Sequence, residues 1–140
     1  MSTLERAIEI AVQAHQGQKE KTGTPYILHP LRVMMSLSSE AEMIAAVLHD
    51  VVERSPWTFD ELRQEGFSEE ILGALDCVTR RENETYEEFV GRNKRNPLGR
   101  RVRTADLEDK LDLRRVTDLR EEHLQRLQRF HRAWRILAGD

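Results

Sequence analysis

The sequence predicts an all-α protein, a single domain spanning residues 1–140 and built as a bundle of about seven or eight helices. Apolar residues recur three and four positions apart almost everywhere along the chain, which is the spacing of a helix face. Several segments also begin with a serine or threonine that can cap a helix, followed three residues later by a glutamate. No segment shows a convincing alternation of apolar and polar residues, which is the pattern of a half-buried strand.

The N-terminal residues carry one apolar stripe and predict a helix capped by Ser2 or Thr3. Glycines and prolines interrupt the helical pattern over residues 17–30, where we expect a loop. Pro30 suits the first turn of a short helix over residues 31–38.

A central helix follows over residues 40–54, capped by Ser38 or Ser39. It is apolar almost all round from Met43 to Val52, which predicts that it is buried. Capping signals and apolar stripes then predict five further helices, the fourth of them with Pro97 in its first turn. They span residues 59–66, 69–81, 86–95, 97–115 and 121–137.

Length and composition exclude several classes of protein. A chain of 140 residues with 39% hydrophobic and 34% charged residues is sufficient for one globular domain. Its single cysteine, Cys77, excludes an intrachain disulfide. The longest apolar run, Ile44 to Leu48, is far shorter than the ~20 residues of a membrane span, and charged residues occupy the N-terminal segment. We expect a soluble, cytoplasmic protein with no membrane partner.

Charge is unevenly distributed along the chain. Residues 1–79 are acidic, residues 80–103 are basic, and residues 104–140 are balanced, for a net charge of −3. Nucleic-acid-binding domains are usually basic overall, so we expect no nucleic-acid partner. The basic stretch could meet a small anion or could form an ordinary solvated surface.

Two polar residues, His49 and Asp50, interrupt the apolar run of the central helix. A buried carboxylate is costly unless it is paired or bound to a metal, so this dyad is either a structural polar pair or part of a metal site. His29 and Asp106 favour a metal site, because two histidines and two aspartates suit Mn²⁺, Fe²⁺ or Zn²⁺. Glu53 follows His49 by four residues and could orient or deprotonate a water molecule, or simply face solvent.

The segments GTPYILHP, AAVLHDVVE and RTADLEDKLDL occur in that order. In this pattern the chain resembles the HD-domain metal-dependent phosphohydrolases, and specifically the branch of small alarmone hydrolases and RelA/SpoT hydrolase domains. The resemblance extends from residue 14 to about residue 115. It implies an HD-domain helical bundle that removes the 3′-pyrophosphate of the nucleotide ppGpp or pppGpp.

The resemblance also implies roles for individual residues. It makes His29, His49, Asp50 and Asp106 the ligands of a divalent metal, most often Mn²⁺. Glu53 corresponds to the first member of an acidic pair beside the metal. Lys21 and Tyr26 correspond to residues near the nucleotide.

Three positions depart from the resembled pattern. Arg54 stands where the second acid is usual, Glu20 where an arginine is frequent, and Lys110 where an asparagine is usual. Arginine stays protonated, so Arg54 at this catalytic position cannot act as a base. Arg54 and Lys110 could instead bind phosphate, or Arg54 could point to solvent.

The basic stretch supplies two further candidates for substrate binding, Arg92 and Lys94, which the resemblance places before the last metal ligand. Alternatively, these two residues are ordinary surface charges without a substrate contact. We expect His15, His123 and His131 to be structural. Asp109 is expected either to orient a ligand or to pair with a nearby arginine, and Asp112 is expected to pair; Trp57, Trp134 and Cys77 are expected to be packed.

The leading hypothesis is therefore a metal-dependent hydrolase of ppGpp. The alternatives are a nucleotidase or phosphatase acting on another nucleotide-like substrate, and a degenerate domain that binds metal or alarmone without turnover. Apolar positions on the last helix could serve the core or a homodimer contact.

Overall fold

The computed structural model describes residues 2–139, and all the regular elements in that range are helices, which confirms the predicted fold class. No strand occurs in it; Lys19 and Pro25 form one isolated bridge. The elements are α1 (Leu4–Ala14), α2 (Leu28–Met35), α3 (Glu40–Leu48), α4 (Val51–Arg54), α5 (Phe59–Gln64), α6 (Glu69–Val78), α7 (Tyr86–Arg95), α8 (Pro97–Lys110), the 3₁₀ turn η1 (Leu113–Arg115) and α9 (Glu121–Ala138).

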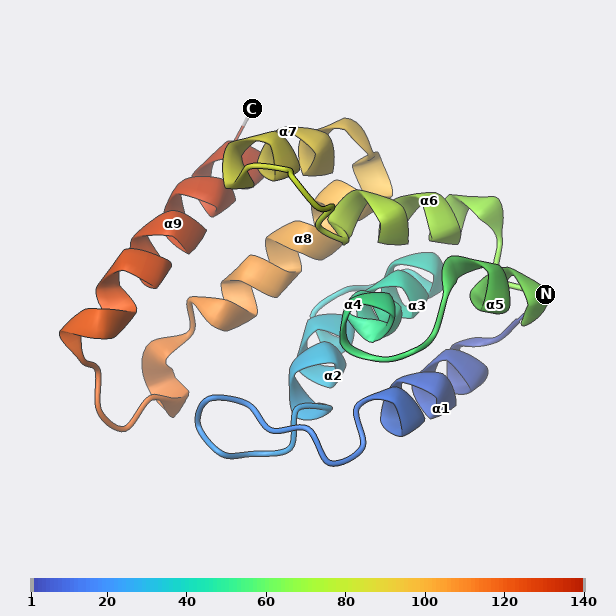
Figure 1. The fold of residues 1–140 in the computed structure, drawn as a ribbon, viewed down its shortest axis with the longest axis horizontal. Helices are drawn as coiled ribbons and strands as arrows, with labels where there is room; N and C mark the ends of the chain where they lie inside the picture. Colours follow the sequence, from blue (N-terminus) through green and yellow to red (C-terminus); the bar gives the residue numbers. More distant parts are fainter. Residues whose placement is uncertain (1, 140) are drawn as a thin grey trace.

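The larger of two hydrophobic cores surrounds α3. Residues Ile44 to Leu48 of this helix are buried, and α3 packs against α1, α2, α6 and α8 (Figure 1). Val51, Leu62 and Leu75 extend the same core into α4, α5 and α6. The sequence prediction of a buried central helix is thereby confirmed.

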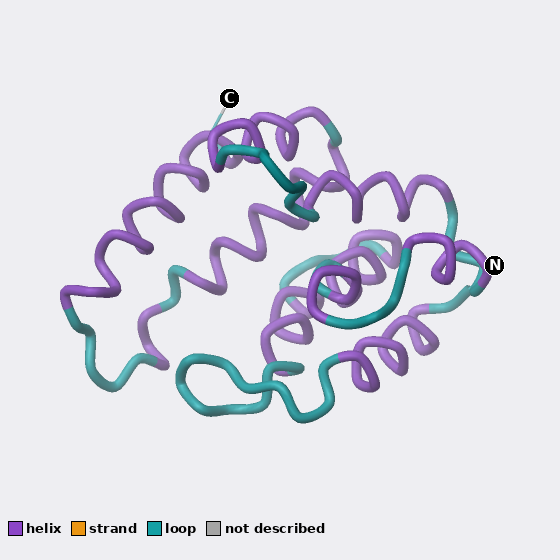
Figure 2. The backbone as a smooth tube through the Cα atoms, viewed as in Figure 1, coloured by secondary structure: helices purple, strands orange, loops and turns teal. Residues whose placement is uncertain are grey.

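A second, smaller core joins α7, α8 and α9. It consists of Val90, Leu107, Ala133 and Leu137, with three aromatic side chains packed against it. Helix α8 belongs to both cores, since Leu98 and Val102 lie in the larger one. The α9 helix therefore extends along α8 as an arm beside the main body (Figures 1 and 2).

Helix starts follow the predicted caps. Ser39, Thr58 and Thr85 each form a capping box with the glutamate three residues on, and Ser68 and Thr3 cap α6 and α1. These side chains satisfy backbone N–H groups that the first turn leaves unpaired.

Several predicted helices have other bounds than expected. The predicted 59–66 and 69–81 helices end at Gln64 and Val78, and the predicted 31–38 helix spans Leu28–Met35 instead. Two further differences have a local cause. The predicted 40–54 helix breaks at His49 and Asp50 into α3 and α4, because the Ala46 carbonyl accepts the ring Nδ1–H of His49 (2.6 Å) as the helix ends. The predicted 97–115 helix ends at Lys110 and is followed by η1. There the Asp112 carboxylate accepts the backbone N–H of Arg114, which competes with continued helix.

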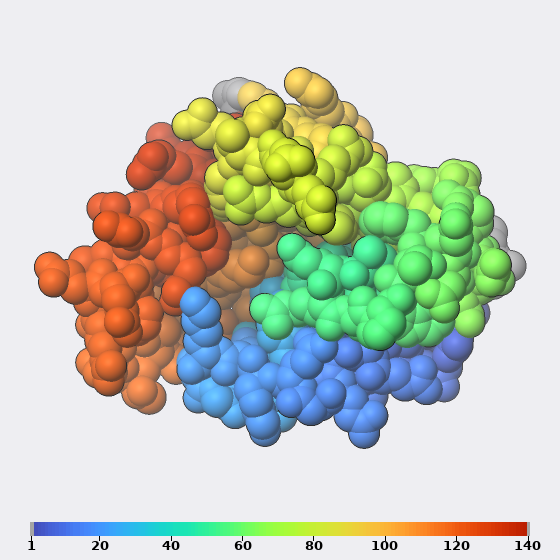
Figure 3. Space-filling model, viewed as in Figure 1, coloured from blue at the N-terminus to red at the C-terminus, as the bar shows by residue number. Residues whose placement is uncertain are grey.

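A hollow opens between the main body and the arm. In the space-filling view it lies where α9, the loop before α2 and the region of α4 face one another (Figure 3). No helix in residues 2–139 is both long and apolar enough to cross a membrane.

Candidate metal centre

The hollow is a cavity of about 340 Å³. Its walls come from the loop before α2, from α2, from the α3–α4 junction and α4, from the end of α8 with the segment after it, and from α9. Tyr26, His29 and Asp50 lie at its base. Six cationic side chains line it: Lys19, Lys21, Arg54, Lys110, Arg115 and Arg126.

The four predicted metal ligands come together at the base of the cavity. His29, His49 and Asp50 each offer one ligand atom within 4.8 Å of the others. Asp106 joins them, because its Oδ1 lies 2.9 Å from the Nε2 of His29 and 3.4 Å from the Nε2 of His49. All four residues are buried. The break between α3 and α4 and the last turns of α8 supply three of them.

Both histidines present the same ring nitrogen to this point. The Nδ1–H of His49 donates to the Ala46 carbonyl, and the Nδ1 of His29 lies 2.6 Å from the Asp109 carboxylate. These partners fix each ring with Nε2 facing the carboxylates, as is usual for metal-binding histidines. The Nε2 of His49 is buried and makes no hydrogen bond among the described residues.

The electrostatics of the cluster favour a positive charge. Burial lowers the pKa of His49, but the negative charges of Asp50 and Asp106 outweigh it and raise that pKa to about 10. The negative charge of the two aspartates thus favours a positive charge at this point, as a divalent cation would supply. Two imidazoles and two carboxylates form a suitable ligand set for such an ion.

Neighbouring side chains hold the aspartates in place. The Tyr26 hydroxyl donates to Asp50. The buried guanidinium of Arg103 donates to Asp106 and, 3.0 Å away, to the hydroxyl of Tyr86. Although burial alone would raise it, the pKa of Asp106 is lowered by the positive charges of Lys110, His49 and Arg103.

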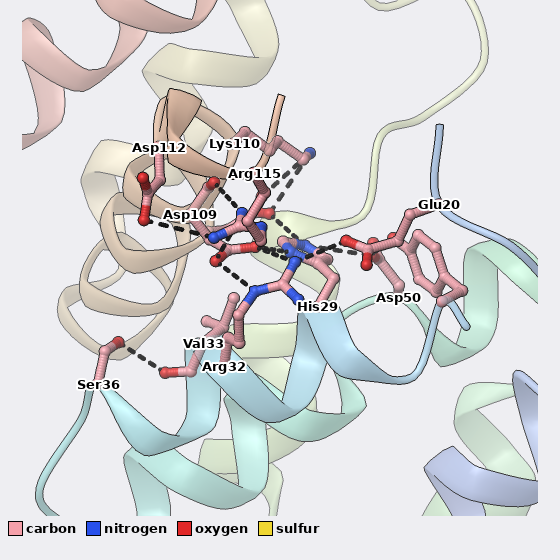
Figure 4. Close-up of polar contacts among 12 residues, drawn as sticks. Glu20, His29, Arg32, Val33, Ser36, Asp50, Asp109, Lys110, Asp112 and Arg115 are labelled. Carbon is pink, nitrogen blue, oxygen red and sulfur yellow. Dashed lines mark hydrogen bonds and ion pairs between the residues drawn. The ribbon is translucent and has the colours of Figure 1, made fainter. Parts of the chain in front are cut away.

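Asp109 has both of the roles foreseen for it. It orients His29, and it also accepts from Arg32 (2.8 Å) and Arg115 (3.2 Å) (Figure 4). The same Arg32 donates to Glu20 at 2.6 Å. The Glu20 carboxylate is thus held against α2 rather than left as a free charge in the cavity.

Glu53 and Arg54 stand side by side at the rim. The Glu53 side chain opens on the cavity, where partial loss of water and the charge of Asp50 raise its pKa. The guanidinium of Arg54 lies over the ring of Tyr26, with its Cζ 3.9 Å from the ring centroid. The two side chains form no ion pair in the part of the chain that the structure describes.

Lys21 and Lys110 line the cavity from two different elements. Lys21 is exposed on the loop before α2, and its pKa is lowered by partial burial and by the nearby Arg126 and Arg129. Lys110 ends α8 with its Nζ 3.4 Å from Asp106. Both lysines therefore line the cavity, and their contact with a substrate stays a prediction.

The structure does not bring Arg92 and Lys94 to this cavity. Arg92 is held by Glu84 at 2.8 Å and by the carbonyls of Asp76 and Thr79, so its donors are used within the fold. Lys94 lies beside a different hollow, near the ends of α2 and α9. These two predicted substrate contacts are corrected, because Arg92 is held within the fold and Lys94 lies at the other hollow.

The remaining polar predictions hold in detail. His15 is buried and bonded to Gln18, His123 accepts the backbone N–H of Arg120 at the start of α9, and Asp112 pairs with Arg114 at 2.7 Å. His131 is exposed and stacks on Trp134. Cys77 is buried, and Trp57 and Trp134 pack against the two cores.

Sequence reasoning missed Arg103 and Arg126. Arg103 lies three residues before Asp106 on the same helix face, and this spacing was an available signal. Arg126 lies on a helix far along the chain, and no local pattern marks it as a cavity residue.

A helical bundle with a buried His-His-Asp cluster and an adjoining aspartate defines a class of metal-binding domain. The chain matches the HD domain family over residues 7–133 and belongs to that family. HD domains bind divalent metal ions, and the cluster described above is the place where this chain would hold one.

Two longer proteins are similar in sequence to most of this chain. A guanosine-3′,5′-bis(diphosphate) 3′-pyrophosphohydrolase of Aquifex aeolicus is 34% identical over 121 residues, which are 78% of this chain and 17% of that protein. A probable GTP pyrophosphokinase of Mycobacterium leprae is 33% identical over 76% of this chain and 15% of its own length. The chain thus spans about a sixth of these two relatives.

One solved structure has the same fold. It is described as a metazoan ortholog of SpoT that hydrolyses ppGpp, and it matches with a TM-score of 0.78 over 96% of this chain and 84% of its own. The two sequences are 21% identical, so this likeness concerns the fold.

Proposed function

We propose that this protein is a metal-dependent hydrolase that removes the 3′-pyrophosphate of ppGpp or pppGpp. The observation that carries the proposal is the buried cluster of His29, His49, Asp50 and Asp106 at the base of a cavity lined by cations. The names of the Aquifex relative and the SpoT-like structure support this substrate. A cavity of about 340 Å³ is within the range of small-molecule sites.

The four ligands would hold one divalent cation, for which we propose Mn²⁺ because the donors are nitrogen and oxygen. When bound, such an ion polarises a phosphoryl oxygen and lowers the pKa of a water molecule.

The protein groups around the cluster would then have distinct tasks. Glu53 is positioned to accept a proton from the attacking water, and its raised pKa brings it closer to that task. The water oxygen would bond to the phosphorus that is attached to the 3′ oxygen, and the bond between that phosphorus and the 3′ oxygen would break. The proton that Glu53 accepts from the water would pass to the 3′ oxygen and complete the 3′ hydroxyl. Pyrophosphate and GDP or GTP are the products.

Positive charges would receive the substrate. Lys21 and Lys110 face the cavity from two elements and would bind phosphate oxygens, whose charge grows as the bond breaks. Tyr26 acts indirectly, because its hydroxyl orients Asp50. An ion pair between Arg54 and Glu53 would have favoured a domain that binds without turnover. These two side chains form no such pair within residues 2–139.

The direct test is product release from ppGpp in the presence of Mn²⁺, with the His49→Ala variant as control. We expect pyrophosphate and GDP from the parent protein and none from the variant, while the circular dichroism of both remains helical. Absence of product from the parent would remove ppGpp as substrate and leave other nucleotides to be surveyed. Equal product from the variant would show that the metal assignment is wrong.

We further propose that residues 1–140 act as one domain in the cytoplasm, on a small-molecule nucleotide. The homodimer remains a prediction that light scattering would test.

A further inference from the structure

Arg54 lies close to the predicted metal ligands and stacks on a tyrosine ring that is bonded to one of them. It ends α4, four residues after the ligand Asp50, and its guanidinium lies over the ring of Tyr26. Tyr26 is buried, and its hydroxyl donates to Asp50. The tyrosine thus forms a fixed platform that ends at a metal ligand and carries a positive charge on its ring face.

The donors of this guanidinium are unused within residues 2–139. Within these residues, Arg54 makes one hydrogen bond to another element, and it uses the backbone carbonyl of Arg54, which accepts from Gln18. A guanidinium stacked on a ring keeps its five N–H donors in its own plane, free to meet a ligand at the edge.

Arg54 also makes no ion pair within residues 2–139, although its positive charge acts on the neighbouring carboxylate of Glu53. Three other acidic residues of the cavity wall already have arginine partners: Asp109 and Glu20 pair with Arg32, and Asp112 pairs with Arg114. Glu53 makes no ion pair with Arg54. An exposed cation with a free planar donor set beside a metal cluster is the arrangement that binds phosphate oxygens in a bidentate manner.

We propose that Arg54 is a specificity residue that binds the second phosphate of a pyrophosphoryl group whose first phosphate is at the metal. The separation of the two points supports this role. The ligand carboxylate lies at the hydroxyl end of Tyr26 and the guanidinium lies over its ring, so the two binding points are set apart along the tyrosine, as the two phosphates of a pyrophosphoryl group are. The choice of substrate in this inference rests on the proposed function. In this role Arg54 selects pyrophosphate esters over monophosphate esters.

The test compares the binding of inorganic pyrophosphate and orthophosphate by isothermal titration calorimetry, using the Mn²⁺-loaded protein at fixed ionic strength. The variants are Arg54→Gln and Arg54→Lys. Arg95→Gln is the matched control, because Arg95 is exposed, ends α7, and lies outside the cavity lining. Mn²⁺ affinity, measured first, verifies that each variant keeps the metal cluster.

We expect Arg54→Gln to weaken pyrophosphate binding about tenfold, the loss typical of a hydrogen bond to a charged group, and orthophosphate binding less than twofold. Arg54→Lys should be intermediate, since a lysine keeps the charge and loses the planar fork. The control should bind both anions as the parent does. An equal loss for both anions, or no loss for either, would overturn the proposal.

Charge reversal gives an independent measurement. If the parent hydrolyses ppGpp, Arg54→Asp should lower kcat/KM, mainly through KM. A rise would show that the arginine only obstructs the site. If the parent does not hydrolyse ppGpp, the proposed function fails, while the calorimetric preference for pyrophosphate still decides the role of Arg54.

Discussion

Replacing Arg103 by methionine should destabilise the protein far more than removing a comparable arginine from the surface. Arg103 is 5% exposed and donates to Asp106, which is 2% exposed. Methionine fills a similar volume without charge, so the variant leaves a buried carboxylate that has lost its guanidinium. Removing one partner of a buried ion pair costs about 3–5 kcal/mol, because the other charge remains desolvated.

The expected loss lies at the low end of that range. In the variant, Asp106 still has His29 at 2.9 Å and Lys110 at 3.4 Å, and these partners offset part of the cost of burying its negative charge. A loss of about 3 kcal/mol is a large part of the roughly 7–20 kcal/mol expected for a chain of 140 residues. The melting temperature should fall on the order of 10 °C.

Urea denaturation followed by circular dichroism measures this loss. The matched control is Arg101→Met, on the same helix, where the arginine is 53% exposed and pairs with Glu42 at 2.5 Å. That pair should contribute about 0–1 kcal/mol. Adding Asp106→Asn to Arg103→Met should recover stability, since the stranded charge is removed. Equal losses for the Arg103 and Arg101 variants would refute the reasoning that burial makes the pair important.

Further outcomes follow from charge, packing and metal binding. The pKa of Glu84 is lowered from 4.5 to about 2 by its arginine partner on α7, so Glu84→Gln should lose stability at pH 7, and chemical denaturation should find this difference disappearing as pH falls from 4.5 toward 2. A Cβ at Gly99 would lie 2.6 Å from the sulfur of a cysteine on α6, so Gly99→Ala should cost about 1–3 kcal/mol. Gly91 has open space, so Gly91→Ala should instead gain about 0.5–1 kcal/mol, and melting curves of the two variants should move in opposite directions. Mn²⁺ at a hundred times its Kd should stabilise the parent by about 2.7 kcal/mol in a thermal shift assay and leave Asp50→Asn unchanged; an equal shift in the variant would place the ion elsewhere.

Local signals predicted where helices begin, because a capping box is complete within four residues. Thr58 with Glu61, for example, needs nothing from the rest of the fold. The helix breaks depend on more distant contacts. The His49–Asp50 break occurs where two carboxylates and a second histidine converge, and Asp106 arrives there from a helix 56 residues later.

The metal cluster could be predicted because its residue types are unusual in an apolar frame. The roles of the cationic residues could not be predicted in this way, because these residues lie in segments already rich in charge. Arg92 and Arg103 both lie in the same basic stretch, yet one closes a loop through Glu84 and the other is buried against Asp106. Only tertiary packing separates these roles, since both are arginines on short helices rich in charge.

The two-core construction has a consequence for how this protein could vary. Helix α8 is anchored in both cores and carries Asp106, while the arm helix α9 brings Arg126 to the cavity and rests on the smaller core. A change in the volume of Leu137 or Ala133 would tilt the arm and alter the width of the cavity without touching the metal ligands. The ligands that the cavity admits could therefore change through apolar exchanges remote from the metal site, and a survey of HD domains confined to their polar residues would overlook such exchanges.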